Sequence, residues 1–147
     1  MGNGLAGFGL RFHHLGLAVP APHTSMVFLE ALGYAPGAAA FDPLQNVHLA
    51  MRHHPTMPDV EVIWPGEGPS PIDHLIRRGH MIYHICYVTE DAAASLDAMA
   101  VAGLEVVPVG VAKPAALFGG VAVSFHSVDQ LGLIELIHGE PRPGGVK

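Results

Sequence analysis

The sequence predicts an α+β fold made of two copies of one unit, a strand followed by a helix and three more strands. Short segments in which apolar and polar residues alternate predict the strands. Two segments with helix-capping and helix-ending residues each follow the first strand of a half. Because this order of segments occurs twice along the chain, we expect two similar modules that pair their sheets around a shared cleft.

The first half opens with an apolar, alternating strand over residues 12–19 (FHHLGLAV), and a proline follows it directly. Thr24 or Ser25 can cap a helix, and Gly33 ends that helix. The segment 37–43 carries no clear signal for either a helix or a strand. Two further strands are expected, near residues 46–52 and 60–64.

A turn-rich segment, PGEGPSP, leads from the first half into about two helical turns over residues 72–78, which Gly79 ends. The second half then repeats the order of the first. Its opening strand covers residues 81–88, and Asp91 caps an alanine-rich helix that ends at Gly103. The remaining strands of this half are expected over residues 104–109, 121–126 and 131–138.

These segments predict one domain, because 147 residues, half of them hydrophobic, are enough to form a single apolar core. The domain is expected over residues 12–138, with module one at 12–65, a connecting segment at 66–80 and module two at 81–138. Flexible tails are expected at residues 1–11 and 139–147, where glycine and proline are frequent.

Composition and charge exclude several classes of function. The formal net charge of −6 and the absence of a basic cluster argue against nucleic-acid binding, because a phosphate backbone would be repelled. No uncharged apolar run approaches the roughly 18 residues that a membrane span needs. The N-terminal residues do not resemble a signal peptide. Since Cys86 is the only cysteine, no disulfide can form within the chain, and we expect a cytoplasmic protein.

Four residues with metal-binding side chains fall at matching places in the two halves. His14 and His84 lie in the first strand of each half, and Glu61 and Glu135 lie in the last. Each acid stands alone among apolar residues, where a carboxylate costs several kcal/mol unless it is paired or bound to a cation. The four residues therefore predict a site for one divalent metal ion, and their mixed donors suit Zn, Ni, Co, Mn or Fe.

Each of these residues also has a simpler interpretation. A single histidine can be a hydrogen-bonded core residue, and a single glutamate can pair with a lysine or arginine. However, the chain has only seven lysine and arginine residues, and none lies close to Glu61 or Glu135 in sequence. The matching positions of the two histidines and two acids in the repeat therefore favour the metal site.

Four segments resemble a known family: HHLGLAV at 13–19, VEVIWPGEGPSPIDHLI at 60–76, YHICYVTED at 83–91 and FHSVDQLGLIELI at 125–137. The chain resembles the vicinal oxygen chelate superfamily over residues 12–138, and within it the glyoxalase and methylmalonyl-CoA epimerase branch. The resemblance implies two paired βαβββ modules that form an open, incompletely closed, eight-stranded, barrel-like sheet around a metal cleft. It implies that the first and last strands of each module supply the metal ligands, here His14, Glu61, His84 and Glu135.

The resemblance further implies a divalent-metal-dependent isomerase, epimerase or lyase that removes a proton next to a metal-polarised carbonyl. The substrate would be a small molecule, including an acyl-CoA or another thioester. Glu135 or Glu61 would act as the catalytic base, with Glu135 favoured. Lys113, expected in a loop over the cleft, is a candidate for binding a carboxylate or phosphate of the substrate.

One position departs from the epimerase pattern, and two other functions stay open. Leu44 occupies the place where epimerases carry a catalytic acid, although Asp42 lies close in sequence. The alternatives are an Fe(II)-dependent dioxygenase of the same superfamily and a small-molecule-binding protein of the resistance type. A fourth protein ligand counts against the dioxygenase, and an intact set of metal ligands counts against the binding protein. We expect a homodimer, whose two halves pair within one chain or exchange between chains.

Overall fold

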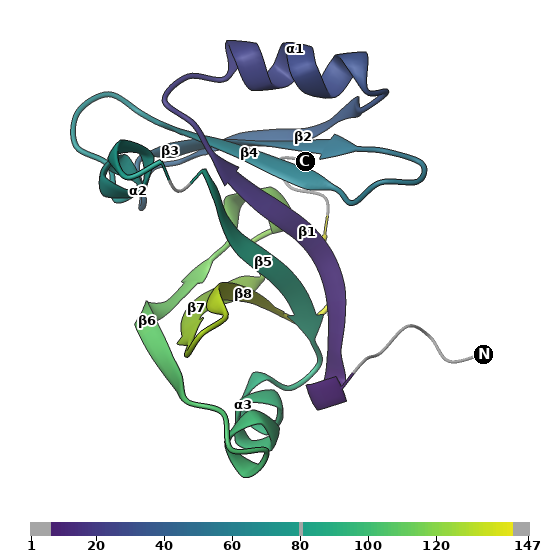
Figure 1. Cartoon of the computed structure of the whole chain (residues 1–147), viewed down its shortest axis with the longest axis vertical. Coiled ribbons are helices and arrows are strands. Elements are labelled where there is room, and N and C mark those ends of the chain that lie inside the picture. The colour runs from purple at the N-terminus through teal and green to yellow at the C-terminus, as the bar shows by residue number, and fades with distance from the viewer. Residues whose placement is uncertain (1–6, 80, 143–147) are drawn as a thin grey trace.

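The computed structural model describes residues 7–79 and 81–142 (Figure 1). The first half contains η1 (Gly7–Gly9), β1 (Leu10–Ala18), α1 (His23–Ala31), β2 (Ala35–Asp42), β3 (Val47–His53), β4 (Val60–Pro65) and α2 (Asp73–Arg77). The second half contains β5 (Ile82–Thr89), α3 (Ala92–Val101), β6 (Val106–Pro114), η2 (Ala116–Phe118), β7 (Ala122–Val128) and β8 (Gly132–His138). Among the helices of these described residues, none is long and apolar enough to cross a membrane.

All eight strands belong to one sheet, in the order β2-β3-β4-β1-β5-β8-β7-β6. β1 runs parallel to β4, and β5 runs parallel to β8, so each half has the same arrangement of first and last strand. The two halves join where β1 and β5 pair in antiparallel orientation across the middle of the molecule (Figure 1). This topology confirms the expected α+β fold of two βαβββ modules, and the modules pair within one chain.

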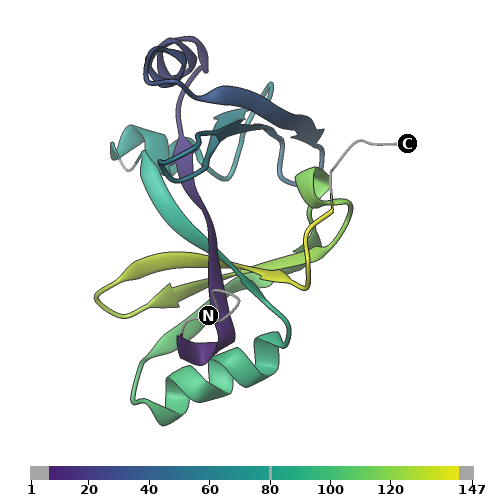
Figure 2. The ribbon, with the colours of Figure 1, turned by 90° about the vertical axis from the view of Figure 1, so that its right-hand side faces the viewer.

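The sheet curls but does not close by hydrogen bonds, because β2 and β6 remain its two edges. Figure 2 shows that η2 lies near β2, on the side where the two halves of the curled sheet approach each other. Leu117 and Phe118 of η2 belong to a buried apolar cluster, against which Ala38 and Ala40 of β2 pack. Apolar packing therefore joins the two halves where the ladder of hydrogen bonds ends.

α1 and α3 cover the outer face of the sheet at opposite ends of the molecule (Figure 1). Leu29 of α1 packs with Val60 and Val62 of β4, and Met99 of α3 packs with Leu10 of β1. The inner face carries the cluster that contains Leu117 and Phe118. Since β-strand side chains alternate between faces, the consecutive buried residues of β4 and β8 show that these strands are covered on both faces, whereas most of the edge strand β6 is exposed.

The structure corrects the expected start of one helix and assigns one segment that the sequence left open. α1 begins at His23, with Pro22 at its N-cap and no side-chain hydrogen bond, so the expected cap by Thr24 or Ser25 is wrong. The Ser25 hydroxyl instead lies 3.4 Å from the Pro22 carbonyl oxygen. The unassigned segment 37–43 is mostly strand β2, which pairs along its length with β3. The cap by Asp91 is confirmed, since its carboxylate accepts a hydrogen bond from the Ala94 backbone at 3.0 Å.

The described ends of the chain are attached to the sheet. β1 starts at Leu10, two residues before the expected start of the domain at residue 12. The Gly139 backbone N–H donates to the Thr89 carbonyl at 2.8 Å. The Arg11 guanidinium donates to both carboxylate oxygens of Glu140, at 2.9 and 2.8 Å. The rest of the expected tails, residues 1–6 and 143–147, lies outside the described residues.

Candidate metal centre

The register of the parallel strands places one histidine and one glutamate side by side in each half. In the first half, Gly16 of β1 lies opposite Glu61 of β4. In the second half, Cys86 of β5 lies opposite Glu135 of β8. His14 lies two residues before Gly16, and His84 lies two residues before Cys86. In each half, the imidazole and the carboxylate therefore face the same side of the sheet. The two halves thus present the same pair of donors by the same geometry.

The antiparallel pairing of β1 with β5 then brings the two pairs of donors together. His14 lies opposite Cys86, and Gly16 lies opposite His84. The ring centroids of His14 and His84 are 5.4 Å apart, and their Nε2 atoms are 3.3 Å apart. The site therefore lies at the seam between the modules and needs strands from both of them.

The four candidate ligands converge on one buried point. His14 Nε2 lies 3.4 Å from Oε1 of Glu61 and 3.4 Å from Oε1 of Glu135. His84 Nε2 lies 2.9 Å from Glu135 Oε1 and 3.8 Å from Glu61 Oε1. None of the four residues is more than 5% exposed. The structure thus brings together the whole set that the sequence predicted, although 120 residues of chain lie between its first and last member.

The spacing and chemistry of these atoms fit a divalent ion. Donors bound about 2.1 Å from one ion lie about 3.0–3.4 Å from one another, which is close to the observed spacing. Although His84 Nε2 is near Glu135 Oε1, this oxygen has no partner with hydrogen-bond geometry among the described residues. Two buried carboxylates and two imidazoles would balance the charge of a divalent cation and supply four of its ligands.

The carboxylates also control the protonation of the His14 imidazole. Burial lowers the pKa of His14, but Glu61 and Glu135 outweigh burial and raise this pKa to about 10. Burial alone would raise the pKa of Glu135, but His84 and His14 outweigh it and hold this pKa well below its usual range. Without an ion, a protonated His14 supplies the positive charge between the two carboxylates, and a bound cation would replace that proton.

A family model described as the glyoxalase/bleomycin resistance protein/dioxygenase superfamily matches residues 13–125 of the chain. The chain belongs to this superfamily. The resemblance to vicinal oxygen chelate proteins is therefore confirmed. Among proteins with curated function, no sequence matches the chain significantly.

Solved structures of the same fold include methylmalonyl-CoA epimerases. A hypothetical protein from Bacillus halodurans has a TM-score of 0.71 and 20% identity, over 92% of this chain and 99% of its own. Methylmalonyl-CoA epimerase from Mycobacterium tuberculosis has a TM-score of 0.69 and 21% identity, over 97% of this chain and 93% of its own. A Streptomyces coelicolor methylmalonyl-CoA epimerase variant bound to 2-nitronate-propionyl-CoA has a TM-score of 0.65 and 19% identity, over 87% of this chain and 96% of its own. At these identities, the likeness shows the shared fold.

A cavity opens beside the four donors of this superfamily member. Glu61 and Glu135 line it, together with Tyr83, and η2, β3 and β7 contribute mostly apolar side chains. Asp42 also lines the cavity and is only 3% exposed. Its carboxylate accepts hydrogen bonds from the Leu44 backbone N–H at 2.9 Å and from the Gln45 side-chain amide at 3.1 Å. Asp42 is thus a third acid at the cavity.

Two positions singled out in the sequence lie away from the cavity wall. The side chain of Leu44 is 67% exposed and is not among the lining residues. Lys113 lies in β6, opposite Val123, so the expected loop at this position is wrong. No lysine or arginine is found among the residues that line the described cavity. An anionic group inside the cavity would therefore meet carboxylates rather than a cationic side chain.

Gly16 is a site residue that the sequence interpretation missed. A Cβ atom at this position would collide with the imidazole ring of His84, so only glycine lets the ring lie against β1. A glycine inside an otherwise apolar strand is a known sign of such a close approach. The equivalent place in the second half is Cys86, which is fully buried in the cluster that contains Leu117 and Phe118. Burial raises the pKa of its thiol, and the nearby Glu135 carboxylate adds to that shift.

Proposed function

We propose that this superfamily member is a divalent-metal-dependent isomerase, epimerase or lyase that removes a proton next to a carbonyl group. The observation that carries the proposal is the convergence of two imidazoles and two carboxylates at one buried point beside a cavity. His14, Glu61, His84 and Glu135 would hold the ion. A bound divalent metal supplies Lewis acidity, which polarises a carbonyl and makes the neighbouring C–H bond more acidic.

Glu135 is the residue that we assign to proton abstraction, with Glu61 as the alternative. Both carboxylates line the cavity, so both can reach a substrate there. Oε1 of Glu135 has no hydrogen-bond partner among the described residues, so this carboxylate could leave the metal and accept a proton without breaking a hydrogen bond. A general base must lie within hydrogen-bond distance of the proton that it removes. The low pKa of Glu135 in the metal-free protein means that its carboxylate is ionised at neutral pH.

The outcome of the reaction depends on where the proton returns. Return to the same carbon from the opposite side gives epimerisation, and return to the neighbouring carbon gives isomerisation. Asp42 is a third acid at the cavity wall, and it could return the proton only after taking one up from the substrate or solvent. The solved epimerases of this fold bind acyl-CoA ligands, which supports an acyl thioester as one substrate class. Lys113 could contact only a part of the substrate that extends beyond the cavity.

The metal centre is tested by elemental analysis of the untagged protein. We expect about one divalent ion per chain in the wild type and a large loss of metal in His14→Ala, because two imidazoles and two carboxylates share one ion. The exposed His23 provides a matched control, and His23→Ala should retain the metal. A folded wild-type protein that binds no Zn, Ni, Co, Mn or Fe on addition would overturn the proposal.

The proton transfer is tested by solvent deuterium exchange in the metal-loaded protein. A panel of acyl-CoA thioesters and small carbonyl compounds is incubated in deuterated buffer, and incorporation next to the carbonyl is followed by mass spectrometry. We expect Glu135→Gln to remove exchange while the exposed control Glu90→Gln leaves it unchanged. Unchanged exchange in Glu135→Gln, with loss in Glu61→Gln, would transfer the role of base to Glu61.

The superfamily also contains dioxygenases and resistance proteins, as its description states. Four protein ligands leave fewer open positions on an iron than a dioxygenase needs for oxygen and substrate. A protein that only binds a small molecule has no need for buried, converging donors. Oxygen uptake by the Fe(II)-loaded protein, without deuterium exchange for any carbonyl compound, would favour the dioxygenase.

We also propose that the chain forms a homodimer in the cytoplasm. Apolar side chains that are more than half exposed, such as Phe28 and Ile82, line a depression on the outer face of the sheet. Burial of such surface against a second copy would be favourable. Sedimentation velocity checks this expectation, and a single monomeric species at micromolar concentration would contradict it.

A further inference from the structure

A β-bulge at His13 resets the alternation of side chains along β1. In the pairing with β5, Phe12 lies opposite Tyr87 and His14 lies opposite Cys86, so His13 has no partner of its own. Leu10 therefore packs under α3 on the outer face, whereas His14, four residues later, faces inward. In a regular strand these two residues would share a face. The extra residue is what turns His14 toward the metal centre.

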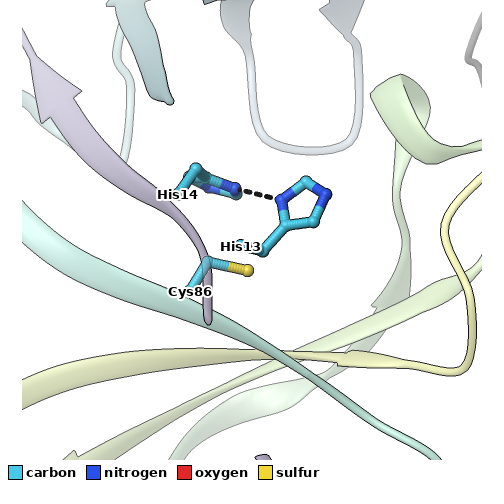
Figure 3. Close-up of side chains that lie close together, drawn as sticks. All are labelled: His13, His14 and Cys86. Atoms are coloured by element: carbon cyan, nitrogen blue, oxygen red, sulfur yellow. Dashed lines mark hydrogen bonds between the residues drawn. The ribbon is translucent and has the colours of Figure 1, made fainter. Parts of the chain in front are cut away.

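The same bulge brings the imidazole of His13 against that of His14. The two ring centroids are 5.1 Å apart and the rings are nearly perpendicular. Their Nδ1 atoms lie 2.8 Å apart, within hydrogen-bond distance. Figure 3 shows both side chains leaving β1 and turning toward each other, with Cys86 beside them. Adjacent residues of a regular strand point to opposite faces, so this contact depends on the bulge.

The contact restricts where the hydrogen atoms can lie. A hydrogen bond between two Nδ1 atoms needs one nitrogen that carries a hydrogen and one that does not. Nε2 of His14 faces Glu61, Glu135 and His84, and a nitrogen that binds a cation must present a bare lone pair. The hydrogen of a neutral, coordinating His14 therefore lies on Nδ1 and is donated to His13.

We propose that His13 is a positioning residue, whose bare Nδ1 accepts the hydrogen of His14 Nδ1 and holds His14 in the tautomer that can bind a metal. The inference rests on the metal centre of the proposed function. His13 itself is oriented by Phe118 of η2, whose ring stacks edge-on at a centroid distance of 5.2 Å. Metal-binding histidines usually donate their second N–H to a carboxylate or carbonyl, and here a second imidazole takes that place.

The other metal-binding histidine lacks such a partner. Nδ1 of His84 is buried and has no hydrogen-bond partner among the described residues. His84 is instead confined by packing, because its ring lies against Gly16 on one side and near Phe125 on the other. The two halves of the repeat thus supply equivalent ligands by different means, a hydrogen bond for His14 and a close backbone approach for His84.

Two substitutions of His13 separate the hydrogen bond from the packing. His13→Phe keeps a ring but removes the acceptor, whereas the amide oxygen of His13→Asn can replace Nδ1 as acceptor. We expect His13→Phe to weaken zinc binding by about 10- to 100-fold, measured in competition with a chelator, and His13→Asn to stay close to the wild type. Nitrogen-15 NMR of the imidazoles should show hydrogen on Nδ1 of His14 and none on Nδ1 of His13.

Several outcomes would overturn the inference. Wild-type zinc affinity in His13→Phe, or hydrogen on Nδ1 of His13, would contradict it directly. Binding of two zinc ions, with one lost in Cys86→Ala, would show that His13, His14 and Cys86 hold a second ion instead. If His13→Phe does not fold, His13→Gln replaces it, since its amide oxygen reaches the place of Nε2 rather than Nδ1, and it should bind zinc more weakly than His13→Asn.

The same measurements distinguish this inference from the proposed function. If the wild type binds no metal but Nδ1 of His13 is bare, the proposed function fails and the contact between the two histidines stands. If the wild type binds metal and exchanges deuterium, but His13→Phe changes neither affinity nor the NMR signals of His14, the function stands and the positioning role fails.

Discussion

At the scale of single residues, the candidate metal centre depends on the close approach of the His84 ring to the backbone of Gly16. The imidazole of His84 occupies the space that a Cβ atom at Gly16 would need. We expect Gly16→Ala to displace the ring, to release the metal and to lower the free energy of unfolding by about 1–3 kcal/mol through overpacking. Metal analysis and urea unfolding check this. Gly7→Ala is the control, because nothing lies within 4 Å of a Cβ there, and it should keep the metal.

The protonation of His14 predicts how metal affinity depends on pH. Because Glu61 and Glu135 raise its pKa to about 10, a metal ion must displace a proton from His14 at neutral pH. Affinity should therefore rise about tenfold per pH unit from pH 7 and level off as the pH passes that pKa. Isothermal titration in buffers of different ionisation enthalpy measures the released proton. Glu61→Gln should shift the levelling-off to lower pH, and a pH-independent affinity would contradict the expectation.

The convergence of the four candidate ligands could be predicted from sequence because the repeat compares each residue with a second copy. His14 and Glu61 had counterparts at His84 and Glu135, so an isolated polar residue became part of a pattern. The residues that support these ligands have no such counterpart. Gly16 corresponds to Cys86, and the role of His13 depends on a bulge in the strand register, which no local sequence pattern specifies.

At the scale of the elements, the cap of α3 contributes measurably to stability. The Asp91 carboxylate accepts the Ala94 backbone N–H and satisfies one of the unpaired donors at the start of the helix. We expect Asp91→Ala to lower the free energy of unfolding by about 1 kcal/mol. Thermal unfolding checks this against Asp97→Ala, which changes an exposed acid within the same helix and should cost less. Equal effects of both substitutions would argue against the cap.

The other elements show which local signals were decisive. Glycine ended α1 as predicted, because Gly33 adopts a φ of 100° that other residues avoid. The start of α1 could not be placed, because Pro22 takes the N-cap position without any side-chain bond. β2 could not be recognised, because its proline, glycine and alanines have low strand propensity. Pairing with β3 forms that strand, and a register shift between Pro36 and Ala39 accommodates the poor strand formers.

At the scale of the whole molecule, η2 is the apolar link between the open edges of the sheet. Leu117 is 2% exposed and packs in the cluster that contains residues of both halves. We expect Leu117→Ala to lower the free energy of unfolding by about 2–5 kcal/mol, because it leaves a cavity at this junction. Urea unfolding should still show one transition, since both halves share that cluster. Leu131→Ala, at a leucine that is 62% exposed, should cost far less.

The location of the four donors at the seam between β1 and β5 has a consequence for the kinetics of folding. His14 and Glu135 lie near opposite ends of the chain, so their contact is of long range and closing the loop between them costs chain entropy. Neither half alone offers more than one imidazole and one carboxylate. A metal ion would therefore meet all four candidate ligands only once both halves have paired, so we expect metal to slow unfolding more than it speeds folding. Metal supply would then set the lifetime of the folded chain more than the speed at which it forms.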